Sequence, residues 1–267
     1  MDILTICGYA GAVAIGVIIG MLGGGGAILA VPILVYLFRV PADDATAYSL
    51  FVVGITALLA SFRYLPRGHV NYRAAFLFLV PSVIFVYLTR TYVVPSIPNQ
   101  IQFGSFVAAK KSVLMVAFAL LMMVAGISML RRLRRAPAAT HVNEGVKNVS
   151  VMLWGTVVGF LAGLLGAGGG FMIVPVLVVF MKLPMKMAVG TSLTVIAGQS
   201  LSGFAGDVIS NHSMDWGFLS LFTGLSLTGM LAGTWLANRI SPESTRRVFG
   251  YFTIAMGATI LMVELFI

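Results

Sequence analysis

Gly20-Met-Leu-Gly-Gly-Gly-Gly-Ala-Ile-Leu-Ala-Val-Pro32 recurs in altered form as Gly163-Leu-Leu-Gly-Ala-Gly-Gly-Gly-Phe-Met-Ile-Val-Pro175, 143 residues later. The same register continues without a gap to Leu50 and Leu193 and contains 13 identities in 31 positions. Shared apolar composition can make leucines and valines coincide, but it does not align glycines with glycines and prolines with prolines. We therefore interpret the chain as an internal duplication.

The composition indicates a membrane protein. Hydrophobic residues make up 59% of the 267 residues, charged residues make up 9%, and the mean hydropathy is +1.02. A soluble core cannot hide that much apolar surface, so most of it must face lipid. The net charge of +9 would suggest nucleic acid in a soluble protein. Here the basic residues occur in short loops between apolar segments, where they orient the protein in the bilayer. Nucleic acid is therefore not an expected partner.

Hydropathy predicts an all-α polytopic fold with five apolar segments in each half, at 3–22, 27–38, 44–62, 74–90, 112–130, 149–165, 170–181, 187–208, 216–237 and 247–266. Each glycine run lies inside a charge-free stretch, Ile3–Phe38 or Asn148–Met181. These stretches are too long for one crossing, which needs about 20 residues. Because glycine is a poor helix former, each stretch is predicted to fold as a glycine-broken hairpin whose ends return to one side.

Basic residues predict the topology. The chain divides into a first transmembrane repeat at 1–130, a basic linker at 131–148 and a second transmembrane repeat at 149–267. Placing the linker in the cytoplasm puts 13 of the 17 Lys and Arg residues inside, provided that both hairpins return to their own side. Five segments per repeat is an odd number, so the repeats are predicted to be inverted, as in many secondary transporters. Both termini are then predicted outside.

The glycine runs are candidate binding elements for a small anion. Irregular backbone at membrane depth must be buried in protein or line a wet cavity. A glycine turn there leaves N–H donors, and the short helices predicted to begin near Ala27 and Phe171 point their positive dipole ends at it. The absence of side chains also lets an oxyanion approach the backbone. The candidate residues are Gly23, Gly24, Gly25, Gly26, Gly166, Gly168, Gly169 and Gly170.

Uncharged polar side chains in the segments that follow are further candidates for the same site: Ser49, Thr191, Ser192 and Gln199. The competing interpretation is that the glycines only let helices pack closely and that the hydroxyls bond neighbouring helices. A primary amide in lipid is costly, which favours a functional role for Gln199, although a partner helix could also satisfy it.

Other classes of site find no support in the sequence. Asp207 and Glu264 lie near segment ends, and no segment has an acidic residue near its middle, which argues against a cation transporter with buried carboxylates. The single Cys7 excludes an intramolecular disulfide and a cysteine-pair metal site. No histidine has ligand spacing, and no nucleophile is paired with a base in a known motif. We expect no catalytic residue, no metal ligand and no cofactor, and therefore no enzyme.

The two glycine motifs with their trailing prolines, together with Gly190-Thr191-Ser192-Leu193 after Pro184, resemble the sulfite exporter TauE/SafE family of membrane permeases. The length, the duplication and the basic linker agree, so the resemblance covers essentially the whole chain. It implies a multi-pass protein of the bacterial cytoplasmic (inner) membrane that moves a small sulfur-containing oxyanion, such as sulfite or an organosulfonate, with export as the expected direction. The first repeat has Ala47-Tyr48-Ser49 where the second has Gly190-Thr191-Ser192, so a site built from both halves is not chemically symmetric.

The resulting hypothesis is a permease that works by alternating access, with one repeat rocking against the other around the paired glycine turns. A carrier of another small anion, such as a carboxylate, is an alternative, and so is a membrane scaffold subunit. A scaffold gives no reason to keep two glycine breaks at membrane depth. The choice of anion, the direction of transport, the coupling ion and the oligomeric state stay open at the level of sequence.

Overall fold

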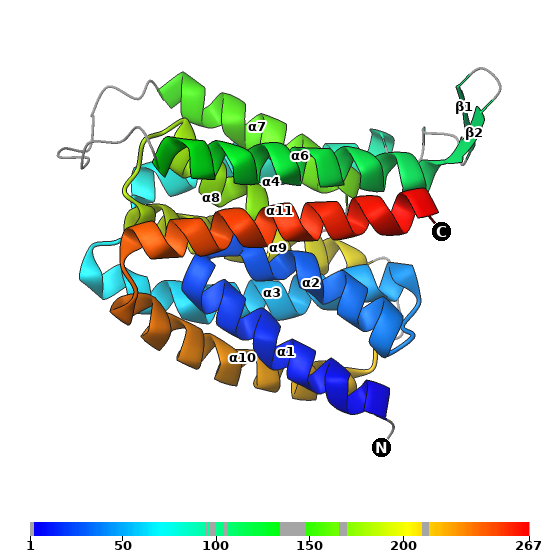
Figure 1. The fold of residues 1–267 in the computed structure, drawn as a ribbon, viewed down its shortest axis with the longest axis horizontal. Helices are drawn as coiled ribbons and strands as arrows, with labels where there is room; N and C mark the ends of the chain where they lie inside the picture. The colour runs from blue at the N-terminus through cyan, green and yellow to red at the C-terminus, as the bar shows by residue number, and fades with distance from the viewer. Residues whose placement is uncertain are drawn as a thin grey trace.

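The computed structural model describes residues 3–93, 96, 100–103, 106–133, 148–165, 170–209 and 214–266. This part of the chain is mainly α-helical, and its helices lie side by side in one bundle (Figure 1). Five of the described helical spans are long and apolar enough to cross a membrane: Thr5–Leu22, Asp44–Arg67, Tyr72–Val93, Trp216–Ala237 and Glu243–Val263. The predicted class, an all-α polytopic membrane protein, is confirmed.

Each predicted apolar segment corresponds to a helix, and the second segment is shared by two short ones. The elements are α1 (Ile3–Leu22), the 3-10 turn η1 (Gly24–Gly26), α2 (Ala27–Pro32), the π-helical η2 (Ile33–Leu37), α3 (Ala42–Tyr64), η3 (Leu65–Arg67), α4 (Tyr72–Leu88), η4 (Thr89–Val93), β1 (Gln100–Phe103), β2 (Phe106–Ala109), α6 (Lys110–Leu133), α7 (Asn148–Leu165), α8 (Gly170–Val179), α9 (Met185–Ile209), α10 (Trp216–Arg239) and α11 (Pro242–Phe266).

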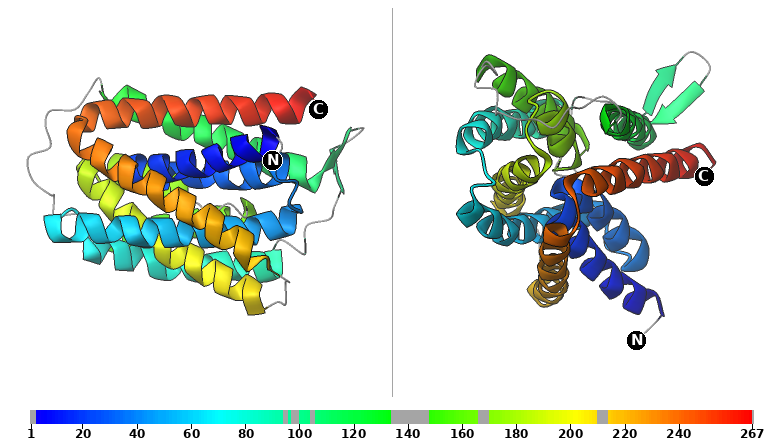
Figure 2. Two further views of the ribbon diagram at one scale, coloured as in Figure 1. Left: turned by 90° about the horizontal axis from the view of Figure 1, so that it is seen from below. Right: turned by 60° about the vertical axis from the view of Figure 1, so that its left-hand side comes forward.

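The antiparallel hairpin of β1 and β2 is an addition to the predicted fold. Phe103 pairs with Phe106 next to the turn, and Figure 2 shows the hairpin projecting from the bundle beside α6. The sequence does contain a signal for it, because Gly104-Ser105 stands between two runs rich in β-formers.

The first glycine run ends α1 and reverses the chain. Gly23 has a φ of 79°, a conformation that L side chains rarely adopt, and η1 follows it directly. The chain then returns along α1, so that the Phe38 ring lies 5.2 Å from the Tyr9 ring near the start of that helix. The glycine-broken hairpin predicted for the first half is therefore observed. In the second half, the corresponding turn at 166–169 lies outside the described residues.

The duplication extends to unusual backbone conformations. Two non-glycine residues in the described part have a positive φ, Arg39 at 56° and Lys182 at 55°, and they are counterparts in the two repeats. Each follows a short helix, and the next residue donates its N–H back toward that helix: Val40 to the Leu34 carbonyl at 3.1 Å and Leu183 to the Leu177 carbonyl at 3.0 Å. The two helix ends therefore have the same backbone conformation and the same hydrogen bond.

Helix pairing follows the same pattern. Helix α1 packs on α10, α7 on α4, α3 on α9 and α6 on α11, and this set is unchanged when each helix is exchanged for its counterpart in the other half. Glycines allow the closest approaches. A Cβ on Gly16 or Gly159 would collide with the backbone carbonyl of Ser226 or Ser82, respectively. The small-residue packing interpretation therefore holds for these glycines.

Helices α3 and α9 run antiparallel through the centre, because Leu50 contacts Gly203 and Tyr64 contacts Gly190. Helix α1 begins and α11 ends at the same end of the bundle, which we call the terminal end (Figure 1). The opposite end is called the basic end because it carries exposed cations: Arg63, Arg67, Arg73, Lys186, Arg239 and Arg247.

Candidate functional site

The two glycine runs meet inside the bundle. Gly24 of η1 lies against Gly170, the first residue of α8, and its Cα is 3.2 Å from the position that a Cβ would take on Gly170. A Cβ on Gly24 would collide with the Gly170 carbonyl. Two predicted site residues from opposite halves are thus in backbone contact. Gly166, Gly168 and Gly169 lie outside the described residues.

The other glycines of the first run are buried and face different elements. A Cβ on Gly23 would lie 2.6 Å from the Ser192 hydroxyl oxygen on α9. A Cβ on Gly25 would lie 3.3 Å from the Phe249 ring, and one on Gly26 would lie 2.5 Å from the Ile15 carbonyl oxygen. Among these glycines, Gly23 is therefore the one next to a polar side chain of the other half, that of Ser192.

Ser49 and Ser192 are buried counterparts with the same local bond. Each hydroxyl donates at 2.8 Å to a carbonyl three residues earlier, that of Thr46 or of Val189. A hydroxyl engaged in this way keeps its acceptor lone pairs and can rotate to another acceptor. Ser192 lies at the Gly23 turn. The residue corresponding to Gly23 for Ser49 is Gly166, which is outside the described part of the chain.

Thr191 serves helix packing. Its hydroxyl accepts a hydrogen bond from the Asn71 N–H at 3.0 Å, at the N-cap of α4. The counterpart of Thr191 is Tyr48, whose hydroxyl accepts from the Asp215 N–H at 2.8 Å, at the N-cap of α10. The Thr191 hydroxyl therefore bonds to a neighbouring helix, and its role in binding the anion stays a prediction.

Gln199 is 2% exposed, and neither its amide nitrogen nor its amide oxygen has a hydrogen-bond partner among the described residues. It lies one turn after Ile196, whose side chain is 3.0 Å from the Cβ position of Gly170. A buried amide without a partner is unusual, because leaving such a group unpaired costs about 1–3 kcal/mol. The amide is thus free to bond with another group.

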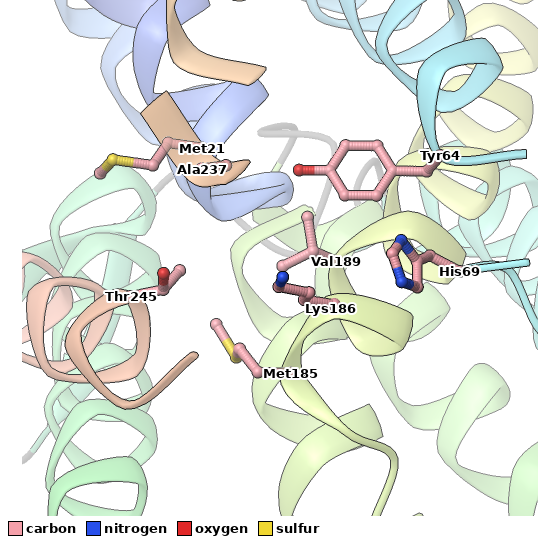
Figure 3. A pocket seen from close by; sticks show the side chains of 8 residues that line it. All are labelled: Met21, Tyr64, His69, Met185, Lys186, Val189, Ala237 and Thr245. Carbon is pink, nitrogen blue, oxygen red and sulfur yellow. The ribbon is translucent and has the colours of Figure 1, made fainter. Parts of the chain in front are cut away.

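A small cavity of about 20 Å³ lies between the glycine turn and the basic end (Figure 3). That volume holds roughly one water molecule. Side chains from α1, α3, α9, α10, α11 and the η3–α4 loop converge on it: Met21, Tyr64, His69, Met185, Lys186, Val189, Ala237 and Thr245. The Cα of Val189 is 3.6 Å from the Cβ position of Gly23, so the cavity adjoins the turn.

Tyr64, which lines this cavity, also forms a hydrogen bond to the end of α1. Its hydroxyl donates to the Gly20 carbonyl at 3.1 Å. Gly20 is in the last turn of α1, where carbonyl groups lose their helical partners, so the phenol replaces a bond that the break removes. Sequence reasoning missed Tyr64, although a tyrosine at the end of an apolar segment with basic residues after it is a usable signal.

Two cationic side chains and one neutral imidazole surround the cavity, so its electrostatic potential is positive. Lys186 and the neighbouring Arg67 are cations. Burial, together with the charges of Lys186 and Arg67, lowers the pKa of His69 below its ordinary value of 6.5. At pH 7 the imidazole is neutral, and it gains a charge only at more acidic pH. The described residues contain no group of three or more His, Cys, Asp or Glu side chains that could hold a metal ion.

A second cavity opens toward the terminal end between α4 and α9. Its volume is about 640 Å³, and Gln199 lies at its deep end. Asp207 and Thr91 lie at the other end, near the ends of the two helices. The two cavities thus lie toward opposite ends of the bundle.

Comparison with known proteins gives a consistent result. A family model described as "Sulfite exporter TauE/SafE" matches residues 9–260. A probable membrane transporter protein of Xylella fastidiosa is 30% identical over 254 residues, which cover 92% of this chain and 91% of the relative. The probable membrane transporter protein YunE of Bacillus subtilis is 27% identical over 252 residues, 88% of each chain. A probable membrane transporter protein of Methanocaldococcus jannaschii is 27% identical over 272 residues, 94% of each chain. No solved structure matches the chain.

Proposed function

The chain belongs to the sulfite exporter TauE/SafE family and is a membrane transporter, not an enzyme, and we propose that it moves a small oxyanion through a site at its paired glycine runs. The anion is a sulfur-containing oxyanion such as sulfite or an organosulfonate, and it is exported across the bacterial cytoplasmic membrane. The observation that carries this proposal is the backbone contact between Gly24 and Gly170, which joins the two runs at one point.

Backbone amides supply the binding groups in this proposal. Helices α2 and α8 both begin at a glycine run, and neither η1 nor α2 has a side-chain cap. The Ala27 N–H donates to the Gly24 carbonyl, so in the first half the proposal assigns the anion to the N–H groups at the start of η1. The dipole of a helix adds roughly 0.3 to 2 kcal/mol per terminus for a bound anion. The Ser192 hydroxyl beside Gly23 adds a donor when it rotates away from the Val189 carbonyl. A site without fixed charge binds an anion and can also release it.

In this proposal the anion reaches the glycine turn through the cavity at the basic end. Lys186 raises the local concentration of anions next to the turn, and the cavity adjoins Gly23 through Val189. The exposed cations of this end support a cytoplasmic position by the positive-inside rule, and in the proposed topology both chain termini are then outside. Loading from the basic end then corresponds to export.

The arrangement of the halves supports alternating access as the mechanism. Counterpart helices α3 and α9 run antiparallel, and helix pairing is unchanged by exchange of the halves. Both features support inverted repeats around an axis in the membrane plane, the architecture in which one repeat rocks against the other.

Flux into proteoliposomes tests the proposal. The purified protein is compared for labelled sulfite, a simple organosulfonate and a carboxylate of similar size. Faster flux of the sulfur oxyanions supports the proposal, whereas faster carboxylate flux supports the alternative substrate. No flux of any anion by folded protein contradicts transport through this site and favours the scaffold alternative.

The Ser192→Ala variant tests the place of the site. It is expected to raise KM for the transported anion, because it removes a donor beside Gly23. Thr223→Ala is the matched control, since Thr223 is also buried and donates to a carbonyl of its own helix at 2.7 Å, but on α10. Equal kinetics of the two variants contradict the assignment of Ser192.

A further inference from the structure

Two helix interfaces that are counterparts in the duplication differ in structure, because one has hydrogen bonds between side chains where the other has a cavity. Helix α3 packs on α10, and the counterpart of this interface is that of α9 with α4. Both interfaces have one hydrogen bond at a helix N-cap, from the Asp215 N–H to the Tyr48 hydroxyl and from the Asn71 N–H to the Thr191 hydroxyl. The α3–α10 interface is bridged in addition by two hydrogen bonds between side chains. The hydroxyls of Thr56 and Ser226 are 3.2 Å apart, and Arg63 Nη1 donates to the Thr234 hydroxyl at 3.3 Å.

The α4–α9 interface contains the 640 Å³ cavity instead, which we call the crevice. Its wall on α4 is mainly apolar and includes Val83, Val86 and Tyr87, whereas α9 contributes Gln199, Ser202 and Gly206. The crevice extends toward the terminal end. The α3–α10 interface is therefore closed by bonds between side chains, whereas the α4–α9 interface is open toward the terminal end.

The polar pair that closes the first interface has a counterpart in the second. Gln199 corresponds to Thr56, 143 residues apart. Ser82 corresponds to Ser226, because Gly159 packs on the Ser82 carbonyl as Gly16 packs on that of Ser226. Ser82 is 0% exposed, and like Gln199 its side chain has no hydrogen-bond partner among the described residues.

We propose that the α3–α10 and α4–α9 interfaces are the two alternating gates of the transport path, and that Gln199 and Ser82 bond to each other when the crevice closes. In the state described here, the Thr56–Ser226 pair holds the gate at the basic end shut while the crevice is open. In the opposite state, the Gln199 amide donates to the Ser82 hydroxyl, and Thr56 separates from Ser226. While the crevice is open, the amide of Gln199 is available to the transported anion.

This inference rests on the proposed function, since it presupposes transport by alternating access. Its physical basis is the cost of two buried polar groups that lack partners. Closing the crevice removes this cost and at the same time breaks the Thr56–Ser226 bond, so the difference between the two terms sets the populations of the two states.

The test uses disulfide locks in the full-length protein with Cys7→Ser. One variant carries Thr56→Cys with Ser226→Cys, and the other carries Ser82→Cys with Gln199→Cys. Each also carries Gly206→Cys as a reporter in the crevice, where a Cβ on Gly206 meets no atom within 4 Å. After oxidation, a membrane-impermeant maleimide is added from the side of the terminal end. Ser241→Cys, exposed at the basic end, replaces the reporter in a control labelled from the opposite side.

The Thr56–Ser226 lock is expected to leave labelling at Gly206 unchanged. The Ser82–Gln199 lock is expected to lower the labelling rate roughly tenfold, because the rate follows the open population. Either lock should abolish flux, and a reductant should restore it. Equal labelling under both locks overturns the inference, as does failure of the Ser82–Gln199 pair to crosslink when the other pair does. Labelling that switches as expected without flux of any tested anion supports the gates and contradicts the proposed substrates.

Discussion

At the scale of single residues, Gly24 and Gly170 allow the backbones of the two halves to come into contact. Their backbones touch, and a side chain on Gly24 can be accommodated only if the two chain segments move apart. The sequence identified these positions because glycine runs in an apolar stretch have few explanations other than a break or a close approach. It did not show which glycine faces which partner, since that depends on the packing of α8 and α9 around the turn.

Gly24→Ala is expected to destabilise the folded protein by about 1–3 kcal/mol, the usual cost of overpacking a tight interior. The added methyl would collide with the Gly170 carbonyl, which cannot rotate away. Thermal unfolding in detergent measures the effect. Gly25→Ala is the matched control, because its methyl meets the movable Phe249 ring at 3.3 Å. Equal loss of stability in both variants would contradict the contact.

His69 predicts a pH dependence of transport. Its pKa lies below 6.5, so the imidazole is neutral at pH 7 and becomes charged as the pH falls through the lowered pKa. Added positive charge in the cavity strengthens the attraction of an anion, and the bound anion favours the charged imidazole in return. KM at the basic end should therefore fall in acid.

An organosulfonate is the suitable substrate for this measurement, because it stays ionised throughout the range and the change must come from the protein. His69→Gln should remove the change in KM and leave the contribution of Lys186. A variant with the same pH profile as the parent protein would show that His69 does not face the anion.

At the element scale, the helices follow from hydropathy and from their end signals. Asn71 and Asp215 cap α4 and α10 with their side chains, and Pro41 and Pro184 precede α3 and α9. These local signals explain why the predicted segments agree with the observed helices to within a few residues. The β1–β2 hairpin and the Tyr64 hydrogen bond were missed for different reasons. The hairpin is a short insertion with no hydropathy signal, and the bond joins helices that are distant in sequence.

Tyr64→Phe tests the bond that joins α3 to the broken end of α1. Removing the phenol hydroxyl leaves the buried Gly20 carbonyl without its partner, which is expected to cost about 1–3 kcal/mol. The change in melting temperature measures this cost. Tyr72→Phe, at an exposed tyrosine, should have little effect. A similar melting temperature for both variants would mean that the bond does not stabilise the break.

At the scale of the whole molecule, the repeats could be inferred from sequence because one 143-residue offset relates glycines and prolines. The same offset relates the positive-φ residues Arg39 and Lys182 and the backbone bonds that follow them. The pairing of the helices is likewise unchanged when the two halves are exchanged. Which interface is open cannot be read from the sequence in this way. The two states of a transporter differ by a few kcal/mol, which is small compared with the terms that set the fold.

The proposed topology can be tested without any substrate. In a protein with Cys7→Ser, a cysteine at the exposed Ser96 of the terminal end should react with an impermeant reagent outside the cell. A cysteine at Ser241 of the basic end should react only after the membrane is opened. The reverse pattern would contradict the assignment of the basic end to the cytoplasm.

Tyr48 and Thr191 hold equivalent helix starts with side chains of unequal length. A transporter made of two identical halves would be isoenergetic in its two end states, because exchanging the halves would convert one state into the other. Every unlike pair of counterparts removes part of that degeneracy. Under the proposed alternating access, the divergence of the repeats therefore gives the protein a preferred resting state, independent of any gradient across the membrane.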